Sequence, residues 1–261
     1  MFGRHRKWRG RRSSRRFRGR HIAYVLEWTV CLGLLLVGGR FFYRYLRESP
    51  VFCVQWVCIE GARVLDPQTV LGASGITTDD NLLLLDLAET EARVARVPYV
   101  KTCRVDRVFP DRVILTIEER TPMATLLLNN GLYEIDGEAV VLRELPRNGA
   151  YPGLLITNVP GLAYVEPGQH LTQPAVAAAL GVWDAFSNVS MAQDVTVSEL
   201  AAYDRNKVLM FCNELPFEIR WGRGGFEDQA RRLDILWREK GKELDCKEYL
   251  DLRFGNDLVC K

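Results

Sequence analysis

The sequence predicts an α+β protein with a single N-terminal transmembrane helix, a β-α-α-β-β domain and then a mainly antiparallel β domain with packed helices. Three observations carry this prediction: a basic tail runs into an apolar segment, two capped helices lie between strands, and more strands with tight-turn residues follow. The predicted segments are a basic cytoplasmic tail at 1–21, a transmembrane helix at 22–46, a first domain at 51–122, a β domain at 123–257 and a C-terminal end at 258–261.

The basic tail and the apolar segment together predict a membrane anchor and its orientation. The first 20 residues carry ten Lys and Arg and no acidic residue. About 20 mostly apolar residues follow, enough to cross a hydrocarbon core of roughly 30 Å as a helix. Because an excess of basic residues marks the cytoplasmic flank, we expect the N-terminus in the cytoplasm and the bulk of the chain outside it. No small-residue cleavage site follows, which predicts an uncleaved single-pass anchor.

The net charge of +2 is the sum of a strongly basic N-terminal tail and an acidic remainder. With the ten basic residues of the tail set aside, the remaining 25 Lys and Arg face 33 Asp and Glu. A basic tail could bind nucleic acid, but its position directly before a spanning helix favours anionic lipid headgroups. We therefore predict a membrane contact and no nucleic-acid partner.

The first domain is predicted from helix caps and alternating strands. Asp66 is an N-cap followed by Pro67, and the helix that they open is expected to end near Gly75. Asp86 and Glu89 have the spacing of a capping box, which predicts a second helix. The expected strands are Phe52–Glu60, Val100–Val108 and Arg112–Glu119, the last two forming a hairpin.

The second domain is predicted from its turns and from helical periodicity. The turns at 129–131 and 136–137 contain Asn-Gly and Asp-Gly, which supply the positive φ that tight hairpins require. Two apolar or amphipathic helices, Pro174–Ser187 and Phe226–Lys240, are expected to pack on the sheet. The expected strands are Ala124–Leu128, Leu132–Ile135, Ala139–Leu142, Val195–Leu200, Lys207–Asn213 and Phe217–Trp221.

A final strand carries the first candidate for a binding edge. Leu250, Leu252 and Phe254 alternate with polar neighbours, as in a strand with one apolar face. The sequence stops within seven residues, so we expect no other part of this chain to cover the strand, and a free edge can accept a partner's strand. The alternative is that Phe254 faces the core together with Leu250 and Leu252.

The pattern of chemically active residues argues against an enzyme. Beyond the membrane segment there is one histidine, His170, which excludes a multi-histidine metal site and a convincing Ser-His-Asp triad. The GxSxG, SxxK, GxxxxGK[ST] and HExxH motifs are absent from the sequence. A carboxylate pair for glycoside hydrolysis stays open, because the separation of two acids depends on the fold. We predict no catalytic residue, metal, cofactor or small-molecule substrate.

The cysteines have no metal-site or redox-motif spacing. Cys31 lies in the membrane segment, and six more follow outside it. Six cysteines allow 15 pairings, so the connectivity is not readable from sequence. Cys53 and Cys58 are five positions apart in one expected strand and would face opposite sides, which argues against their pairing. The other four are Cys103, Cys212, Cys246 and Cys260.

Several segments resemble the FtsQ/DivIB family of bacterial cell-division proteins, in which a membrane helix precedes a POTRA domain and a β domain. The element order of the first domain is POTRA-like, and its hairpin places Pro98, Val100, Val105, Pro110, Arg120 and Pro122 as that family does. The resemblance covers about residues 20–257 and is carried by FCVQWVCIEG, DDNLLLLD, RVPYVKTCRVDRVFPDRVILTIEERTP, LYEIDGEAVV, YPGLLI, FEIRWGRGGFEDQARRLDIL and EYLDLRFGN.

The resemblance implies a function and a set of partners. It implies a non-enzymatic, bitopic scaffold of the divisome at the division septum, which binds small coiled-coil proteins like FtsB and FtsL and other divisome proteins. It links early cytoplasmic division factors to periplasmic cell-wall synthesis. Carried over to this sequence, it implies partner-binding roles for Arg205, Tyr249, Arg253, Phe254, Gly255 and Asn256.

Two other functions remain as alternatives. One is a POTRA-containing protein of outer-membrane secretion or assembly, which the lack of a following β-barrel pattern disfavours. The other is a membrane-tethered cell-wall hydrolase, which the residue pattern above makes the weakest candidate.

Overall fold

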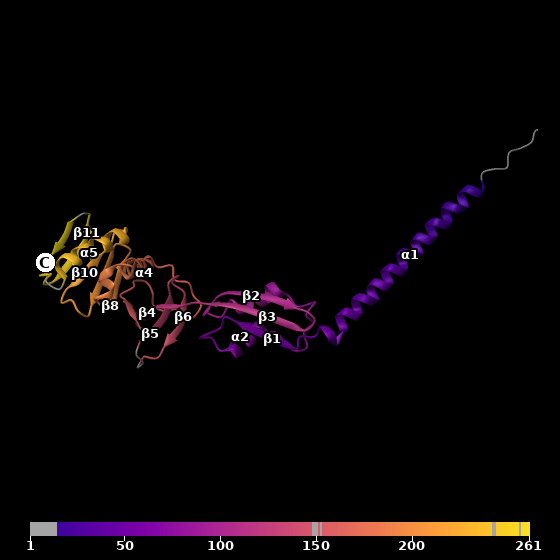
Figure 1. Cartoon of the computed structure of the whole chain (residues 1–261), viewed down its shortest axis with the longest axis horizontal. Helices are drawn as coiled ribbons and strands as arrows, with labels where there is room; N and C mark the ends of the chain where they lie inside the picture. Colours follow the sequence, from indigo (N-terminus) through magenta and orange to yellow (C-terminus); the bar gives the residue numbers. More distant parts are fainter. Residues whose placement is uncertain (1–14, 148–150, 152, 242–243, 256) are drawn as a thin grey trace, which may run out of the picture. The chain divides into compact units, whose positions relative to one another are not determined.

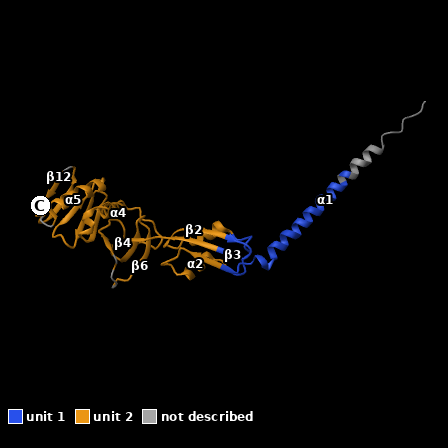
Figure 2. Cartoon of the chain, in the orientation of Figure 1, with its two compact units in different colours: residues 1–56, 77–85, 107–113 blue, residues 57–76, 86–106, 114–261 orange. Residues whose placement is uncertain are grey.

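The computed structural model describes residues 15–147, 151, 153–241, 244–255 and 257–261 (Figure 1). The chain forms two compact units, one of residues 1–56, 77–85 and 107–113 and the other of residues 57–76, 86–106 and 114–261 (Figure 2). The α-helices are α1 (Arg15–Glu48), α2 (Pro67–Ser74), α3 (Leu87–Val94), α4 (Pro174–Ser187) and α5 (Phe226–Lys240), with short 3-10 turns at Pro50–Phe52 and Ser190–Gln193. The strands are β1 (Trp56–Glu60), β2 (Val100–Val108), β3 (Arg112–Glu119), β4 (Pro122–Leu128), β5 (Gly131–Asp136), β6 (Val141–Leu145), β7 (Leu154–Thr157), β8 (Val197–Asp204), β9 (Lys207–Cys212), β10 (Glu218–Trp221), β11 (Tyr249–Phe254) and β12 (Asp257–Cys260).

Helix α1 contains the predicted transmembrane segment. Within it, Leu26–Glu48 is long and apolar enough to cross a membrane, and none of this window is buried against the protein. The apolar side chains from Leu26 to Tyr45 are exposed, as expected for a helix whose natural surroundings are lipid. Where α1 ends, the Asn81 side chain donates to the main-chain oxygens of Leu46 and Arg47, at 3.1 and 2.9 Å. The first 14 residues of the predicted tail lie outside the described residues.

The first sheet has three strands in the order β1-β3-β2, and the two short helices have the predicted caps. The Asp66 carboxylate accepts from the main-chain N–H of Gln68, and Gly75 ends α2 in the left-handed conformation. The Asp86 carboxylate accepts from Glu89 N–H at 3.0 Å and opens α3. The alternate residues Val113, Leu115 and Ile117 of β3 are buried, so one side of this strand faces the core. The predicted first strand, Phe52–Glu60, is shorter in the structure, where β1 begins at Trp56 after a 3-10 turn at Pro50–Phe52 and a short connecting stretch.

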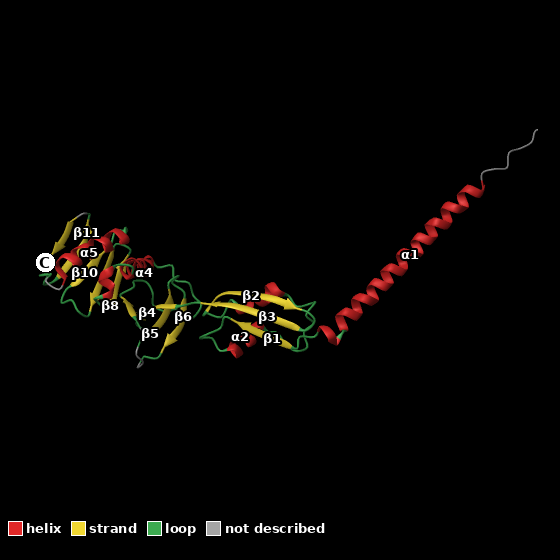
Figure 3. Cartoon of the chain, in the orientation of Figure 1, coloured by secondary structure: helices red, strands yellow, loops and turns green. Residues whose placement is uncertain are grey.

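The second sheet has nine strands in the order β12-β11-β10-β9-β8-β7-β4-β5-β6. Five neighbouring pairs are antiparallel and three are parallel, namely β4 with β7, β7 with β8 and β10 with β11. Helices α4 and α5 pack on one face of this sheet, where Phe186, Trp221 and Leu233 belong to one continuous buried cluster (Figure 3). The Phe186 and Trp221 rings meet edge to face with centroids 6.5 Å apart. The expected mainly antiparallel β domain with packed helices is therefore confirmed.

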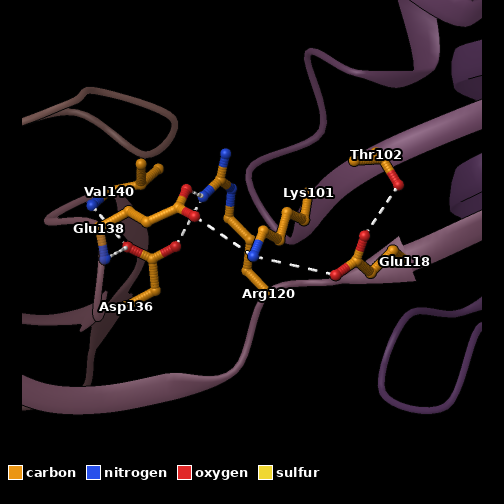
Figure 4. Close-up of polar contacts among 7 residues, drawn as sticks. All are labelled: Lys101, Thr102, Glu118, Arg120, Asp136, Glu138 and Val140. Carbon is orange, nitrogen blue, oxygen red and sulfur yellow. Dashed lines mark hydrogen bonds and ion pairs between the residues drawn. The ribbon is translucent and has the colours of Figure 1, made fainter.

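Arg120, in the link between β3 and β4, joins the first hairpin to the nine-stranded sheet (Figure 4). Its Nη1 donates to Asp136 Oδ2 at 2.7 Å and to Glu138 Oε2 at 2.8 Å. Lys101 Nζ lies 3.2 Å from a carboxylate oxygen of Glu138 and 3.8 Å from one of Glu118. Asp136 also accepts from two main-chain N–H groups of the turn that follows β5.

A second polar contact lies beside this junction and involves Tyr99. The Tyr99 hydroxyl donates to the Glu134 carboxylate, which also accepts from Arg143 Nε at 2.8 Å. Burial, followed by the contact with Glu134, raises the pKa of Tyr99 well above its usual range. Tyr99 therefore stays protonated and remains a hydrogen-bond donor at any ordinary pH.

Candidate functional site

Three connections of the β domain meet at one end of its sheet. Strand β10 is parallel to β11, and β8 and β10 both run antiparallel to β9, so β8, β10 and β11 all point the same way. Their carboxyl ends therefore share one end of the sheet, which we call the sheet end. The β8–β9 turn, the loop 222–225 after β10 and the turn after β11 all lie there. Arg205 belongs to the first of these connections, Arg253 and Phe254 are the last two residues of β11, and Gly255 follows them in the turn.

Close backbone packing fixes the loop 222–225 against the β8–β9 turn. A Cβ atom on Gly222 would lie 1.8 Å from the main-chain oxygen of Asn206, so only glycine permits this approach. The buried Gln229 side chain of α5 donates to the main-chain oxygens of Gly222 and Gly224, at 2.8 and 2.6 Å. The loop is thus held from both sides, and its position does not depend on the exposed side chain of Arg223.

Two hollows meet at Gly224 of this loop. The larger, of about 590 Å³, extends to Arg253 and Gly255 at the end of β11. The smaller, of about 300 Å³, is lined by Arg205 and by apolar side chains of α4 and α5. Arg205 and Arg253, which are 48 positions apart in the sequence, therefore border adjoining hollows of one surface.

Arg253 forms a strong ion pair with Asp251 across the bend of β11. Arg253 Nη2 lies 2.6 Å from Asp251 Oδ2, and Arg253 Nε donates to both oxygens of the same carboxylate. Burial alone would raise the pKa of Asp251, but the hydrogen bonds from the side chain and main chain of Arg253 outweigh it. The pKa of the Asp251 carboxyl is therefore held below its usual value, and the ion pair orients Arg253 at the sheet end.

This ion pair predicts a loss of stability in acid. A carboxyl whose pKa is lower in the folded than in the unfolded state contributes stability that is fully present above the unfolded value, about 3.9 for Asp. That contribution is lost as the pH falls through the lower folded value. We expect the denaturation midpoint to drop less between pH 7 and pH 3 in Asp251→Asn than in the unchanged chain, measured on the detergent-solubilised protein. An equal drop in both would contradict the assignment.

Phe254 is exposed at the sheet end and does not lie in the core. Its side chain is 51% exposed, whereas Leu250 and Leu252 are buried. A shift of register between Asp251 and Phe254 breaks the alternation that would have turned Phe254 inward. The alternative in which Phe254 shares the core face of these leucines is therefore wrong.

The expectation of an uncovered edge on β11 is also wrong. Strand β12 pairs antiparallel with β11 and forms the outermost strand, so the outer side of the sheet belongs to β12. A disulfide between Cys246 and Cys260 joins the end of β12 to the segment before β11. The main-chain oxygen of Lys261 also accepts from the N–H groups of Lys247, Glu248 and Tyr249.

The sheet end does not contain every residue that the sequence suggested. Tyr249 begins β11 and so lies five residues, or roughly 17 Å, along the strand from Phe254. Its ring is half-buried, with the Arg220 guanidinium carbon 3.6 Å from the ring centroid. Asn256 lies outside the described residues.

Sequence reasoning missed the residues that connect Arg205 to Arg253. Arg223 and the apolar hollow formed with Pro174, Ala177 and Phe226 were not singled out. The one available signal is the glycine-rich stretch GRGG, which lies directly before an amphipathic helix. Within the described residues, no group of three or more His, Cys, Asp or Glu side chains is arranged to hold a metal ion.

Comparisons with known proteins agree with this architecture. Residues 52–120 match the family model described as the POTRA domain, FtsQ-type. A cell division protein FtsQ of Syntrophotalea carbinolica is 24% identical over 88% of this chain and 81% of its own length. Proteins of the same name from Myxococcus fulvus and Anaeromyxobacter are 28% and 27% identical, over 88% and 91% of this chain and 80% of their own lengths. The resemblance to the FtsQ/DivIB family is confirmed.

Proposed function

From this likeness to FtsQ/DivIB proteins over most of the chain, we propose that the protein is a non-enzymatic, single-pass membrane scaffold of the bacterial divisome. It links early cytoplasmic division factors to periplasmic septal cell-wall synthesis by binding small coiled-coil proteins like FtsB and FtsL. The observation that supports this best is the sheet end, where Arg205, Arg253, Phe254 and Gly255 are presented on one surface. Exposed aromatic and arginine side chains are the residue types that dominate protein–protein interfaces.

The proposal assigns a role to each segment. The basic tail, 1–21, and the helix, 22–46, anchor the chain in the inner membrane. The β domain, 123–257, carries the contact with FtsB/FtsL-like proteins, and the POTRA-like domain, 51–122, provides a separate contact surface for other divisome proteins. Because β12 covers β11, a strand from the partner would pair with the outer side of β12, and its flanking residues would reach the sheet end.

The proposed orientation is tested with topology reporters. The charge contrast of the first 20 residues predicts that a reporter active only outside the cytoplasm works when fused after Lys261. The same reporter fused before Arg20 is expected to be inactive. The opposite pattern would place the β domain in the cytoplasm and remove the proposed function.

The proposed partner site is tested by Phe254→Ala and Arg205→Glu in the full chain. We expect each to weaken capture of FtsB/FtsL-like proteins from membranes, by about 2 kcal/mol or roughly 30-fold for Phe254→Ala. The thermal midpoint should hardly change, because both side chains are exposed. Arg112→Glu, at an exposed arginine of β3, is the matched control and should leave capture intact.

The same capture experiment separates this proposal from the alternatives. Retention of small coiled-coil membrane proteins supports the divisome scaffold. Retention of outer-membrane barrels would favour a secretion or assembly role. A lowered thermal midpoint for Phe254→Ala together with unchanged capture for Arg205→Glu would place the partner site elsewhere.

A further inference from the structure

The larger hollow of the sheet end concentrates positive charge. Four arginines line it, and Asp228 is its one acidic lining residue. They come from loop 222–225, from α5 and from the end of β11. The arginines are Arg223, Arg231, Arg232 and Arg253.

Only two of the four arginines are neutralised within the described part of the chain. Arg231 pairs with Asp228 at 3.1 Å, and Arg253 pairs with Asp251 at 2.6 Å. Asp228 lies on α5 together with Arg231, and Asp251 lies two positions before Arg253 on β11. The hollow therefore keeps an excess of positive charge that its own acids do not balance.

Arg232 and Arg223 supply this excess charge. Arg232 donates to the main-chain oxygens of Leu252 and Asp228, while its Nη1 is buried and has no partner in the described residues. A buried charged donor without an acceptor is costly, and an acceptor from outside the chain would remove the cost. Arg223 is exposed and makes no hydrogen bond or ion pair with the described residues, so its guanidinium is available to the same acceptor.

The adjoining hollow indicates what kind of molecule carries that acceptor. It touches the arginine-lined hollow at Gly224 and is lined mainly by Pro174, Ala177, Ala178 and Phe226. Two side chains that lie a few residues apart in a peptide, one apolar and one a carboxylate, can occupy the two hollows at the same time. A phosphate group alone would use only the charged hollow.

We propose that the hollow around Arg223 and Arg232 binds a carboxylate side chain of a partner peptide, with an apolar side chain of the same peptide in the hollow beside Phe226. This deepens the proposed function and rests on it, because the occupant is a segment of the partner that reaches the sheet end. Arg223 and Arg232 thereby become partner-binding residues in addition to Arg205 and Arg253.

The test uses the full chain in nanodiscs of neutral lipid and two fluorescein-labelled peptides. One short peptide carries two Glu and two Leu residues, and its twin carries Gln in place of Glu. Fluorescence anisotropy is measured for the unchanged chain, for Arg223→Glu and Arg223→Gln, and for the control Arg112→Glu. Arg223→Glu should keep the fold, because the side chain is exposed and the backbone, with a φ of 65°, already accommodates a side chain.

The expected result is binding of the Glu peptide that Arg223→Glu weakens about tenfold and Arg223→Gln weakens less, since reversal of charge adds repulsion. Arg112→Glu should change it by less than about twofold. Equal binding of the Gln twin would overturn the proposal, as would equal losses in Arg112→Glu and Arg223→Glu. Full displacement of the peptide by millimolar inorganic phosphate would assign the hollow to a phosphate group instead.

Failure of this inference is distinguishable from failure of the proposed function. If capture of FtsB/FtsL-like proteins depends on Phe254 and Arg205 but not on Arg223, the scaffold proposal stands and the carboxylate site is wrong. If the Glu peptide binds as expected but no division protein is captured, the hollow is real and the proposed function is wrong.

Discussion

Replacing Arg120 with alanine is expected to lower the free energy of unfolding by about 3 kcal/mol, because it leaves a buried carboxylate without its cation. The Asp136 side chain is 6% exposed and that of Arg120 is 16% exposed. After the substitution, the Asp136 carboxylate would keep, among the described residues, only the hydrogen bonds from the main-chain N–H groups of Glu138 and Val140 (Figure 4). The measurement is the denaturant midpoint of the detergent-solubilised full chain, followed by tryptophan fluorescence.

Two further variants isolate the cause. Arg120→Lys keeps the charge but cannot reproduce the planar guanidinium geometry, so we expect an intermediate loss. Lys101→Ala removes a cation that is 42% exposed from the same cluster, and exposed ion pairs contribute about 1 kcal/mol at most. If Lys101→Ala were as destabilising as Arg120→Ala, burial would not explain the effect.

Removal of the Cys246–Cys260 disulfide is expected to be the second large effect. The bridge spans 14 residues, and a loop of this size restricts the unfolded chain by about 3 kcal/mol. In the double variant Cys246→Ser/Cys260→Ser, amide hydrogen exchange should accelerate in β12 and in the adjacent β11. Dithiothreitol should produce the same change in the unchanged chain and none in the double variant.

The free cysteines provide the control for this experiment. Cys58→Ser alters an exposed free thiol and should leave exchange in β12 unaltered. Cys212 is buried, which raises the pKa of its thiol to about 12, so it stays protonated and resists alkylation in the folded chain. Unchanged exchange in the double variant would show that the pairing with β11 and the main-chain bonds of Lys261 hold β12 without the disulfide.

Local signals in the sequence predicted most helices and strands well. Helix α2 starts and ends where Asp66 and Gly75 indicated, because an N-cap carboxylate and a left-handed glycine act within one turn of the chain. Strand β12 was not predicted, since DLVC is short and has no clear alternation. Its pairing depends on the bend at Phe254 and on the disulfide, and both are tertiary facts.

The candidate site was predicted only in part for a similar reason. The family resemblance pointed to Arg205 and to the end of β11, and the fold places these on one surface. Their proximity follows from the parallel pairing of β10 with β11, which no local pattern encodes. Arg223 could not be recognised from sequence, because its relevance depends on the close packing of Gly222 against the distant Asn206.

The disulfide that retains β12 also has a consequence for the order of events when a new chain is made. Thiols stay reduced in the bacterial cytosol and are oxidised after export. In the proposed orientation, the outer strand of the sheet is therefore fastened only once the β domain has crossed the membrane. A newly made chain would then complete its docking edge in the same compartment as its partners. Before export, the edge would lack the disulfide that fastens its outer strand.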